Sequence, residues 1–308
     1  HWGPQPQVDR VIIKINPDRD ECVRMVARGE ADMFPQDTLT RDRLYLLDGA
    51  TVDLDVQGHI GPGMALLDFN HTHPMWQDER VRRAVAMAIS HEELSTLTDP
   101  GVSQAWPHYS LSSMEWSFNP DAVAPSHDVD RANELLDEAG LARGADGVRA
   151  RLRLYYLDMF FGHKPISEMV AAQLAKVGLE ITVSGLPART WDDQVSQGHD
   201  FDLIITGGSM TPEMLITRPK YTTGGRNNAA GHHNPDVDAA YDAAARAVSV
   251  VERGKHYRRL QEVFARDVEW VPLVWYGIYD ARTTRFFGYS DQLGFSVPWW
   301  HWGRIRPV

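Results

Sequence analysis

The segment DERVRRAVAMAISHEEL, residues 78–94, places the strongest local constraint on how this chain folds. Asp78 is a good N-cap, because its carboxylate can accept hydrogen bonds from the first backbone amides of a helix. Apolar residues then recur at helical spacing, namely Val81, Ala84, Val85, Ala88 and Ile89. Arg80, Arg82 and Arg83 fall on the opposite face, where we expect solvated charges. The segment therefore predicts an amphipathic helix that buries one face.

Short apolar runs alternate with helices of this kind along most of the chain. Strands are predicted at VIIKI, ALLDFN, RLRLYYL, LEITVSGL, FDLIIT and VPLVWYGIY, which are residues 11–15, 65–70, 151–157, 179–186, 201–206 and 271–279. Further helices are predicted at 128–141, 165–177, 235–249 and 253–267. The strict alternation of LEITVSGL is typical of a half-buried strand, whereas the apolar run FDLIIT favours a central position in a sheet. This order of elements predicts an α/β protein with largely parallel strand pairing.

The charge balance excludes several classes of protein. Asp and Glu number 42 against 31 Lys and Arg, so the formal net charge of the 308 residues is −11. A surface this negative repels a phosphate backbone and an anionic leaflet, so we expect no nucleic-acid partner and no basic membrane contact. No apolar run approaches the roughly 18 residues that cross a bilayer. The single cysteine, Cys22, allows no intrachain disulfide.

Motifs of catalysis and cofactor binding are missing from the sequence. There is no G-x-S-x-G elbow, no Walker A sequence and no H-E-x-x-H pair. His71-x-His73 and His232-His233 could supply metal ligands, but no cysteine or carboxylate cluster accompanies them at helix-ligand spacing. We therefore predict no catalytic residue, no metal and no cofactor, and expect that the chain is not an enzyme.

Aromatic residues are the candidate ligand contacts. A long irregular segment carries Trp106 and Tyr109, while Tyr155, Tyr156 and Trp275 lie at the ends of predicted strands. Aromatic side chains in loops and at strand ends suit a small-molecule site, whose walls are mostly apolar with a few placed polar groups. The competing interpretation is that several of these side chains fill the core. We predict that these five residues supply apolar walls for a ligand.

These segments resemble family 5 of the extracellular solute-binding proteins, the dipeptide-, oligopeptide- and nickel-binding group. Members of that family have a strand ending in Phe-Asn, a proline-containing turn and an Asp-x-x-Val-Arg-x-Ala helix, and residues 65–94 follow this order. Five further segments are similar to family motifs, namely ARGEADMF, DVDRANELLDEAGL, MVAAQLAKVGLEITV, NPDVDAAYDAA and VEWVPLVWY. The six segments keep the family's order and span about residues 8–290.

The resemblance implies a periplasmic-binding-protein-like (type II) fold of two lobes, with mixed, mostly parallel sheets and flanking helices. The N-terminal part of the first lobe is expected to be missing, because full members carry a long segment before the strand that VIIKI matches. The implied domains are 1–68 as the remainder of the first lobe, 69–275 as the C-terminal ligand-binding lobe and 276–308 as the return segment to the first lobe. Hinge strands would map near Asp68–Asn70 and Trp275–Tyr276, since the family closes two lobes on its ligand.

The implied function is that of a receptor of an ABC importer. Such a receptor binds a small ligand, a peptide or another polar solute, outside the cytoplasmic membrane and delivers it to the permease subunits. The resemblance also implies a monomer, with a lipid anchor only in the full-length protein. Two other classes stay open from the sequence. One is the ligand-sensing domain of a cytoplasmic transcription regulator, which an N-terminal helix-turn-helix would indicate, and the less strongly supported one is a hydrolase.

The ligand class is also open, because one stretch departs from the peptide-binding members. Those members place an Asp after the strand that FDLIIT matches, where it pairs with the peptide amine. Here the stretch TGGSMTPEMLITRP has only Glu213 as an acidic residue, and a buried ammonium without a carboxylate is costly. Lys164 corresponds loosely to a segment that anchors peptide carboxylates in some members, and Arg218 and Asn227 are predicted to orient a polyhydroxylated or anionic ligand. Peptides, oligosaccharides, opine-like compounds and metal chelates are the ligand classes considered.

Overall fold

A computed structural model describes residues 7–34, 39, 41–99, 102–160, 162–209, 213–288 and 306–307. Its α-helices are α1 (Arg19–Ala27), α2 (Pro74–Gln77), α3 (Glu79–Ala88), α4 (His91–Ser95), α5 (Val129–Glu138), α6 (His163–Lys176), α7 (Ala188–Trp191), α8 (Arg218–Tyr221), α9 (Pro235–Arg246) and α10 (Val250–Asp267), with the 3₁₀ helices η1 (Arg41–Leu47) and η3 (Met214–Thr217) and the π-helix η2 (Asp192–Gln197). Its strands are β1 (Met33–Phe34), β2 (Leu54–Phe69), β3 (Gln104–Ala105), β4 (Ala150–Leu157), β5 (Leu179–Leu186), β6 (Leu203–Ser209), β7 (Trp270–Thr283), β8 (Phe286–Phe287) and β9 (Arg306–Pro307). None of these helices is both long enough and apolar enough to cross a membrane.

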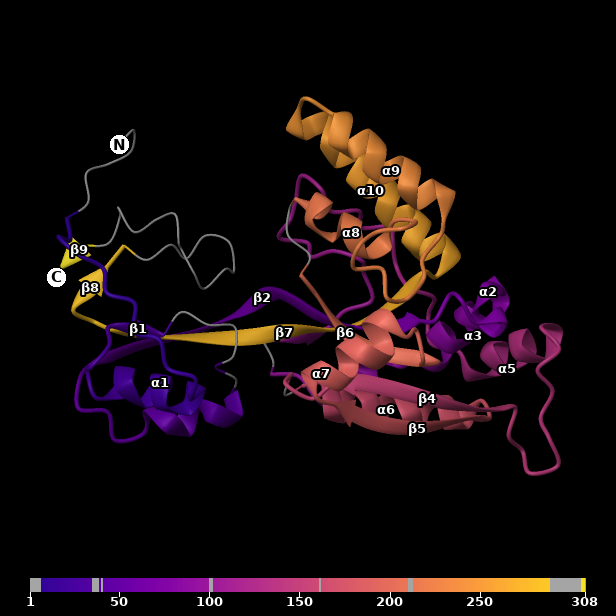
Figure 1. Ribbon diagram of the computed structural model, residues 1–308, viewed down its shortest axis with the longest axis horizontal. Coiled ribbons are helices and arrows are strands. Elements are labelled where there is room, and N and C mark those ends of the chain that lie inside the picture. The colour runs from indigo at the N-terminus through magenta and orange to yellow at the C-terminus, as the bar shows by residue number, and fades with distance from the viewer. Residues whose placement is uncertain are drawn as a thin grey trace. The chain divides into compact units, whose positions relative to one another are not determined.

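The chain divides into two compact units. Unit 1 comprises residues 1–62, 98–104 and 275–308, and unit 2 comprises residues 63–97 and 105–274. The long strands β2 and β7, traced in Figure 1, contribute residues to both units. The domain boundaries expected at 68/69 and 275/276 stay a prediction, and residues 289–305 of the expected return segment lie outside the described residues.

Unit 1 is built on the antiparallel pair β1 and β7, in which Met33 faces Arg282. Helix α1 begins after Asp18, whose side chain accepts a hydrogen bond from the amide of Glu21 and so caps the helix. The core of this unit consists of apolar side chains from α1, β1, η1 and β7 together with one residue that precedes η1, namely Val23, Val26, Phe34, Leu39, Leu46 and Ala281. Burial of this apolar surface is what holds α1 and η1 against the strand pair.

The predicted strand at residues 11–15 is wrong. The segment has no strand conformation, and its apolar side chains are exposed, with 65% of Ile12 and 94% of Ile15 accessible. The β-branched residues of VIIKI give the segment only a propensity for extended structure. A segment with that propensity forms a strand when a neighbouring strand supplies hydrogen-bond partners. Within the described residues, no strand pairs with this segment.

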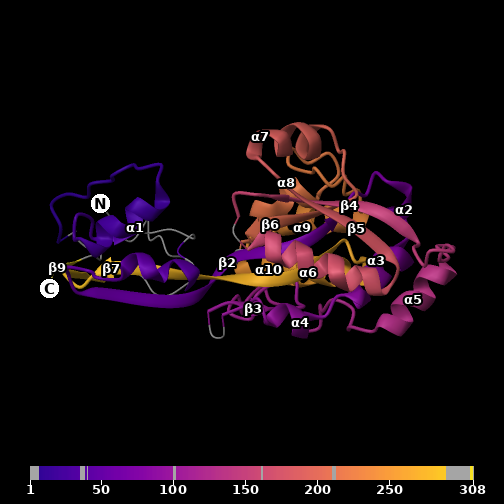
Figure 2. The ribbon, with the colours of Figure 1, turned by 90° about the horizontal axis from the view of Figure 1, so that it is seen from below.

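Unit 2 contains a mixed sheet in the order β2-β6-β4-β5. Strand β6 pairs antiparallel with β2 and parallel with β4, and β4 pairs parallel with β5. The predicted central position of FDLIIT is confirmed, because Leu203, Ile204 and Ile205 are at most 3% exposed. Helix α6 packs against β4 and β5, as Figures 1 and 2 both show, and buries Ile166, Val170 and Leu174. The α/β architecture with a mixed sheet is therefore confirmed.

The helix predicted for residues 78–94 is two helices. Asp78 caps α3 as predicted, accepting a hydrogen bond from the amide of Arg80. Helix α3 ends because Ile89 takes an extended conformation, and α4 then begins at His91. Ser90 caps this second helix by accepting a hydrogen bond from the amide of Glu93. The apolar periodicity continues through this break, which is why periodicity alone did not reveal it.

The prediction that Arg82 is a solvated charge is also wrong. Its side chain is buried and donates hydrogen bonds to the backbone carbonyls of Trp76, Gln77, Asp267 and Val268. The last two carbonyls lie at the C-terminus of α10, where helix carbonyls lack intrahelical partners and carry partial negative charge. The guanidinium therefore serves as a C-cap for another helix, a role that the helical pattern of residues 78–94 does not encode.

Candidate functional site

Trp106 lies directly after β3 and is half-buried. Its backbone amide donates to the carbonyl of Leu273, which continues the pairing of β3 with β7. Its indole Nε1 donates to the carbonyl of Ser110 at 3.0 Å, and its ring packs against His108 with 4.6 Å between the ring centroids. These contacts fix the orientation of the indole while part of its surface stays accessible.

Three other predicted aromatic residues are core residues. Tyr109 and Trp275 are fully buried, and Tyr156 is 9% exposed. The hydroxyl of Tyr109 donates to the carbonyl of Trp270, and its ring packs edge-on against the Trp270 ring. A Cβ placed at Gly185 would come within 2.8 Å of the Tyr156 ring, so the neighbouring strand β5 covers that ring closely. In the described conformation these side chains contribute packing, and their predicted ligand contacts stay a prediction.

Tyr155 lies on the opposite face of β4 from Tyr156 and is half-buried. It packs against an apolar cluster of unit 2 formed by Leu186, Val195, Phe201 and Ile204. The guanidinium of Arg153 lies 5.8 Å from the centroid of its ring, in the range of a cation–π contact. Arg153 is itself held by Asp200 at 2.7 Å and Asp202 at 3.2 Å. Tyr155 therefore offers one accessible aromatic surface beside a neutralised cation.

The predicted polar contacts are all exposed, and two of them already have charged partners. The Lys164 ammonium lies 3.9 Å from the Glu168 carboxylate, and the Arg218 guanidinium forms an ion pair with Asp242. Asn227 is exposed, and its backbone amide donates to the carbonyl of Pro219. Exposed ion pairs of this kind are weak, so an anionic ligand can compete for both cations.

Glu213 has no free carboxylate for a ligand amine. One of its oxygens lies 2.7 Å from the Arg253 guanidinium, and the other accepts a hydrogen bond from the Tyr257 hydroxyl. The Arg253 charge neutralises the carboxylate, so binding a ligand ammonium there would require breaking this pair. Residues 210–212 of the same stretch lie outside the described residues.

A buried group of charged side chains in unit 2 is the strongest concentration of polar chemistry that the sequence did not reveal. It comprises Asp68 on β2, His71 in the following turn, Lys220 on α8, His232 before α9 and Glu269 before β7, and we refer to it as the Asp68 cluster. His232 Nε2 lies 3.1 Å from Asp68 Oδ1, and His232 Nδ1 lies 3.1 Å from Glu269 Oε2. Lys220 Nζ lies 3.4 Å from Asp68 Oδ2. The His71 and His232 rings have centroids 4.5 Å apart.

Opposite charges within the Asp68 cluster shift its titrations. Burial would raise the pKa of Asp68, but the charges of His232 and Lys220 outweigh burial and lower that pKa to about 2. Burial would lower the pKa of His232, yet the carboxylates of Asp68 and Glu269 raise it to about 9. Burial and the neighbouring His232 charge lower the pKa of His71 to about 4. The described conformation therefore carries a protonated His232 between two carboxylates and a neutral His71.

The sequence singles out His71 and His232 only within two separate histidine pairs, and it does not predict the Asp68 cluster, because the members come from distant segments. The sequence pairs the histidines as His71-x-His73 and His232-His233, whereas the structure brings His71 to His232, and His73 and His233 are exposed. Asp68 follows the apolar run Ala65-Leu66-Leu67 and precedes Phe69 within β2, a setting in which a charged residue is unusual. Charges are rarely fully buried unless they are paired.

Asn70, the second residue of the Phe-Asn motif, fixes the turn after β2. Its side-chain amide donates to the carbonyls of His199 at 2.9 Å and Phe201 at 2.7 Å. Its carbonyl oxygen accepts from the amide and the hydroxyl of Thr72. All four hydrogen-bonding capacities of the side chain are therefore used: the two donated bonds join the end of β2 to the segment that precedes β6, and the two accepted bonds hold the turn itself.

Asn70→Asp is expected to lower the free energy of unfolding of unit 2 by about 2–4 kcal/mol, because two backbone carbonyls would lose their donor and face a carboxylate oxygen. Urea unfolding followed by far-UV circular dichroism measures the change. Asn227→Asp, at an exposed position, serves as the matched control and should leave the unfolding midpoint nearly unchanged. Equal midpoints for the two variants would contradict the role given to Asn70.

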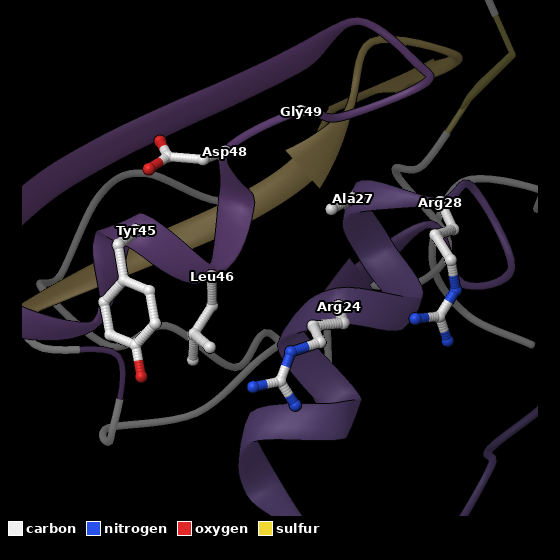
Figure 3. Close-up of a pocket in the computed structure, with 7 residues that line it drawn as sticks. All are labelled: Arg24, Ala27, Arg28, Tyr45, Leu46, Asp48 and Gly49. Carbon is white, nitrogen blue, oxygen red and sulfur yellow. The ribbon is translucent and has the colours of Figure 1, made fainter.

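A pocket of about 230 Å³ lies in unit 1 between α1 and η1 (Figure 3). Its lining consists of Arg24, Ala27, Arg28, Tyr45, Leu46, Asp48 and Gly49, and none of the predicted ligand residues belongs to it. Arg28 is paired with Glu21 and Glu30, and Arg24 lies 3.8 Å from Glu21. Because carboxylates already neutralise its arginines, this pocket has no evident preference for an anion.

Solved structures identify the class of fold. The oligopeptide-binding protein AppA from Bacillus subtilis, solved with a nonapeptide, superposes with a TM-score of 0.75 at 17% identity, covering 96% of this chain and 60% of that one. The binding protein AgaA of A. tumefaciens R10, solved with agropinic acid, gives a TM-score of 0.71 at 19% identity, covering 94% of this chain and 59% of that one. At these identities the likeness shows the fold, which is that of the type II periplasmic binding proteins, and the predicted fold class is confirmed.

The family follows from the sequence comparison. A family model described as bacterial extracellular solute-binding proteins, family 5 Middle, matches residues 1–228, and the chain belongs to this family. The dipeptide-binding protein of Pseudomonas aeruginosa is 22% identical over 305 residues, which cover 94% of this chain and 54% of that protein. The chain thus spans about half the length of that curated relative. The family predicted from the motifs is confirmed.

Proposed function

We propose that this chain is part of a receptor that binds a small polar solute outside the cytoplasmic membrane and delivers it to the permease subunits of an ABC importer. The family match over residues 1–228 carries the proposal, and the type II fold supports it. The receptor binds its ligand without covalent chemistry and is not an enzyme. The monomeric state and the lipid anchor of the full-length protein belong to the same proposal.

The proposed ligand is a peptide or another polar solute, held by aromatic surface and by exposed polar groups. Relatives in the comparison bind a dipeptide, a nonapeptide and agropinic acid by their names, so the family's fold serves more than one ligand class. In this chain Trp106 and Tyr155 are the half-buried aromatic residues of the predicted set, and Lys164, Arg218 and Asn227 are its exposed polar members. Accessible aromatic surface with a few polar groups suits ligand binding.

Native mass spectrometry of the chain, purified without denaturation, tests this proposal. A stoichiometric small molecule, released and identified, is the expected result, and its identity decides between a peptide and another solute. Thermal unfolding with a panel of peptides, opine-like compounds, oligosaccharides and metal chelates provides the second readout, since a ligand that binds the native state raises Tm. A full-length receptor that retains no small molecule and shows no shift with any panel member would refute the proposal.

Ligand recognition is expected not to depend on Glu213, because Arg253 and Tyr257 already occupy its carboxylate. Glu213→Gln should change the ligand dissociation constant by less than about twofold, whereas Trp106→Ala should raise it by about tenfold or more through the loss of aromatic contact area. Isothermal titration with the identified ligand measures both. Circular dichroism checks that each variant is folded. A large loss of affinity in Glu213→Gln would show that this carboxylate binds the ligand.

A further inference from the structure

Asp68, His71 and His232 converge on one buried point of unit 2. One possible ligand atom from each lies within 4.8 Å of the other two. Their exposed fractions are 0%, 4% and 2%. Two imidazoles and one carboxylate form a mixed nitrogen and oxygen donor set, which borderline divalent metals such as Zn²⁺ prefer, whereas Mg²⁺ and Ca²⁺ prefer oxygen alone.

Glu269 orients both imidazoles. His71 Nε2 lies 2.9 Å from the backbone carbonyl oxygen of Glu269, and His232 Nδ1 lies 3.1 Å from its carboxylate oxygen Oε2. Each ring thus uses one nitrogen on Glu269, and the remaining nitrogens are His71 Nδ1 and His232 Nε2. Because Nε2 lies 3.1 Å from Asp68 Oδ1, an ion bound there would replace the proton of His232. Metal-binding histidines characteristically hold a carboxylate or a backbone carbonyl through their second nitrogen.

Asp68 supplies an independent indication of a missing partner. Both of its carboxylate oxygens are buried, and among the described residues neither accepts a hydrogen bond of acceptable geometry, although His232 Nε2 and Lys220 Nζ lie at 3.1 and 3.4 Å. Buried carboxylates normally accept hydrogen bonds or coordinate metals, and here the charges of His232 and Lys220 compensate the Asp68 charge without supplying such hydrogen bonds. The Lys220 ammonium contacts Oδ2, so Oδ1, the oxygen beside His232, is available to an ion.

We propose that Asp68, His71 and His232 bind one divalent metal ion of the zinc class, with Glu269 positioning the two imidazoles. The edges of a tetrahedral zinc site are roughly 3.3–3.4 Å, close to the observed spacing between His232 Nε2 and Asp68 Oδ1. The ion would cross-link the end of β2, the following turn and the loop before α9. This goes beyond the proposed transport function, because the ion is a resident of unit 2 and its binding can be measured without any transported solute.

Metal binding is tested on the 308-residue chain, prepared without a histidine tag and stripped with a chelator. Titration with Co²⁺ is expected to give the visible absorption of a four-coordinate site at one ion per chain, and Zn²⁺ should displace the Co²⁺. Zn²⁺ alone should raise Tm by several degrees, since it binds the native state. Absence of saturable binding at one ion per chain would overturn the proposal.

Single substitutions identify the side chains that bind the metal ion. Asp68→Asn and His232→Gln should each weaken Zn²⁺ binding by about 100-fold or more, whereas His233→Gln, at the exposed neighbouring position, should leave it unchanged. Lys220→Met removes the competing ammonium and should tighten Zn²⁺ binding about tenfold. A merely structural ion-pair network would show no Zn²⁺ binding in any of these proteins. Loss of binding in His233→Gln with retention in Asp68→Asn would place the ion on surface histidines and overturn the assignment.

A measurement on the unaltered chain covers the case in which a buried variant does not fold. X-ray absorption at the metal edge reports the ligands directly. Two imidazoles with additional oxygen ligands are expected. A metal surrounded by oxygen alone, or by a single imidazole, would contradict the proposed site irrespective of how the variants behave. Failure of this test would leave the proposed receptor function untouched, since that function is read out by retained solute.

Discussion

Arg82→Met is expected to lower the free energy of unfolding of unit 2 by about 3–4 kcal/mol, one of the two largest effects of a single substitution that we predict. Methionine keeps most of the aliphatic volume but removes the guanidinium. The carbonyls of Trp76, Asp267 and Val268 would then lose their donor in a site where the Arg82 side chain is only 7% exposed. Two of these carbonyls end α10, so the junction between α10 and β7 should loosen first.

Urea unfolding, followed by far-UV circular dichroism and by tryptophan fluorescence, measures this change. Arg80→Met is the matched control, because Arg80 lies on the same helix with its side chain 51% exposed and paired with Asp78. Exposed ion pairs contribute little, so the control should unfold near the wild-type midpoint. Arg82→Lys should recover only part of the loss, since an ammonium cannot reach carbonyls on both sides as a planar guanidinium does. If Arg82→Met and Arg80→Met unfold alike, the capping role of Arg82 is wrong.

The contrast between Arg80 and Arg82 shows what a helical pattern can predict. The spacing of Val81, Val85 and Ala88 identifies one buried face, and these residues are buried. It cannot identify a polar residue that is buried against a different helix, because that depends on where α10 ends in space. The helical pattern also cannot predict the break between α3 and α4. The extended residues Ile89 and Ser90 end one helix and cap the next, but the spacing of the apolar residues continues across them.

The strand predictions are confirmed where at least one neighbouring strand lies within the described sheet, as for LEITVSGL, which forms β5 at the end of that sheet. FDLIIT was assigned a central position from its apolar composition alone, and β6 lies between β2 and β4. VIIKI has an equally strong β composition but no paired neighbour among the described residues, and it is not a strand. A local β propensity therefore predicts a strand correctly only where a neighbouring strand is available to pair with it.

The sequence identifies candidate ligand residues by their aromatic side chains, but it does not predict which of these side chains are buried in the core. Tyr109 and Trp106 come from the same irregular segment, yet Tyr109 is fully buried against Trp270 and Trp106 keeps accessible surface. The Asp68 cluster could not be assembled from the sequence, because Asp68 and His232 lie far apart in it and come together only in the folded unit. Sequence spacing reveals metal or ion-pair sites when the ligands share a helix or a loop, which these do not.

Trp270→Ala is expected to lower the free energy of unfolding of unit 2 by about 3–5 kcal/mol, because it removes the central member of an aromatic cluster and leaves a cavity. Trp270 is fully buried. Its ring centroid lies 4.6 Å from that of Tyr109, 5.5 Å from Phe264 and 5.7 Å from Tyr221. These partners come from the irregular segment before α5, from α10 and from α8, so one ring joins three segments that are distant in sequence.

Trp270→Phe keeps an aromatic ring but removes the rest of the indole, so it measures how much aromatic packing alone contributes. We expect it to lower the free energy of unfolding by only about 1–2 kcal/mol. Phenylalanine keeps a ring against Tyr109, Tyr221 and Phe264. It also removes the indole Nε1 donor, which is buried and has no hydrogen-bond partner among the residues that the structure describes, and so offsets part of the lost contact. Urea midpoints of the two variants and of Val248→Ala, at a side chain that is 97% exposed, give the comparison. Should Trp270→Phe prove as destabilising as Trp270→Ala, the indole itself, and not the aromatic stacking, would be what joins these segments.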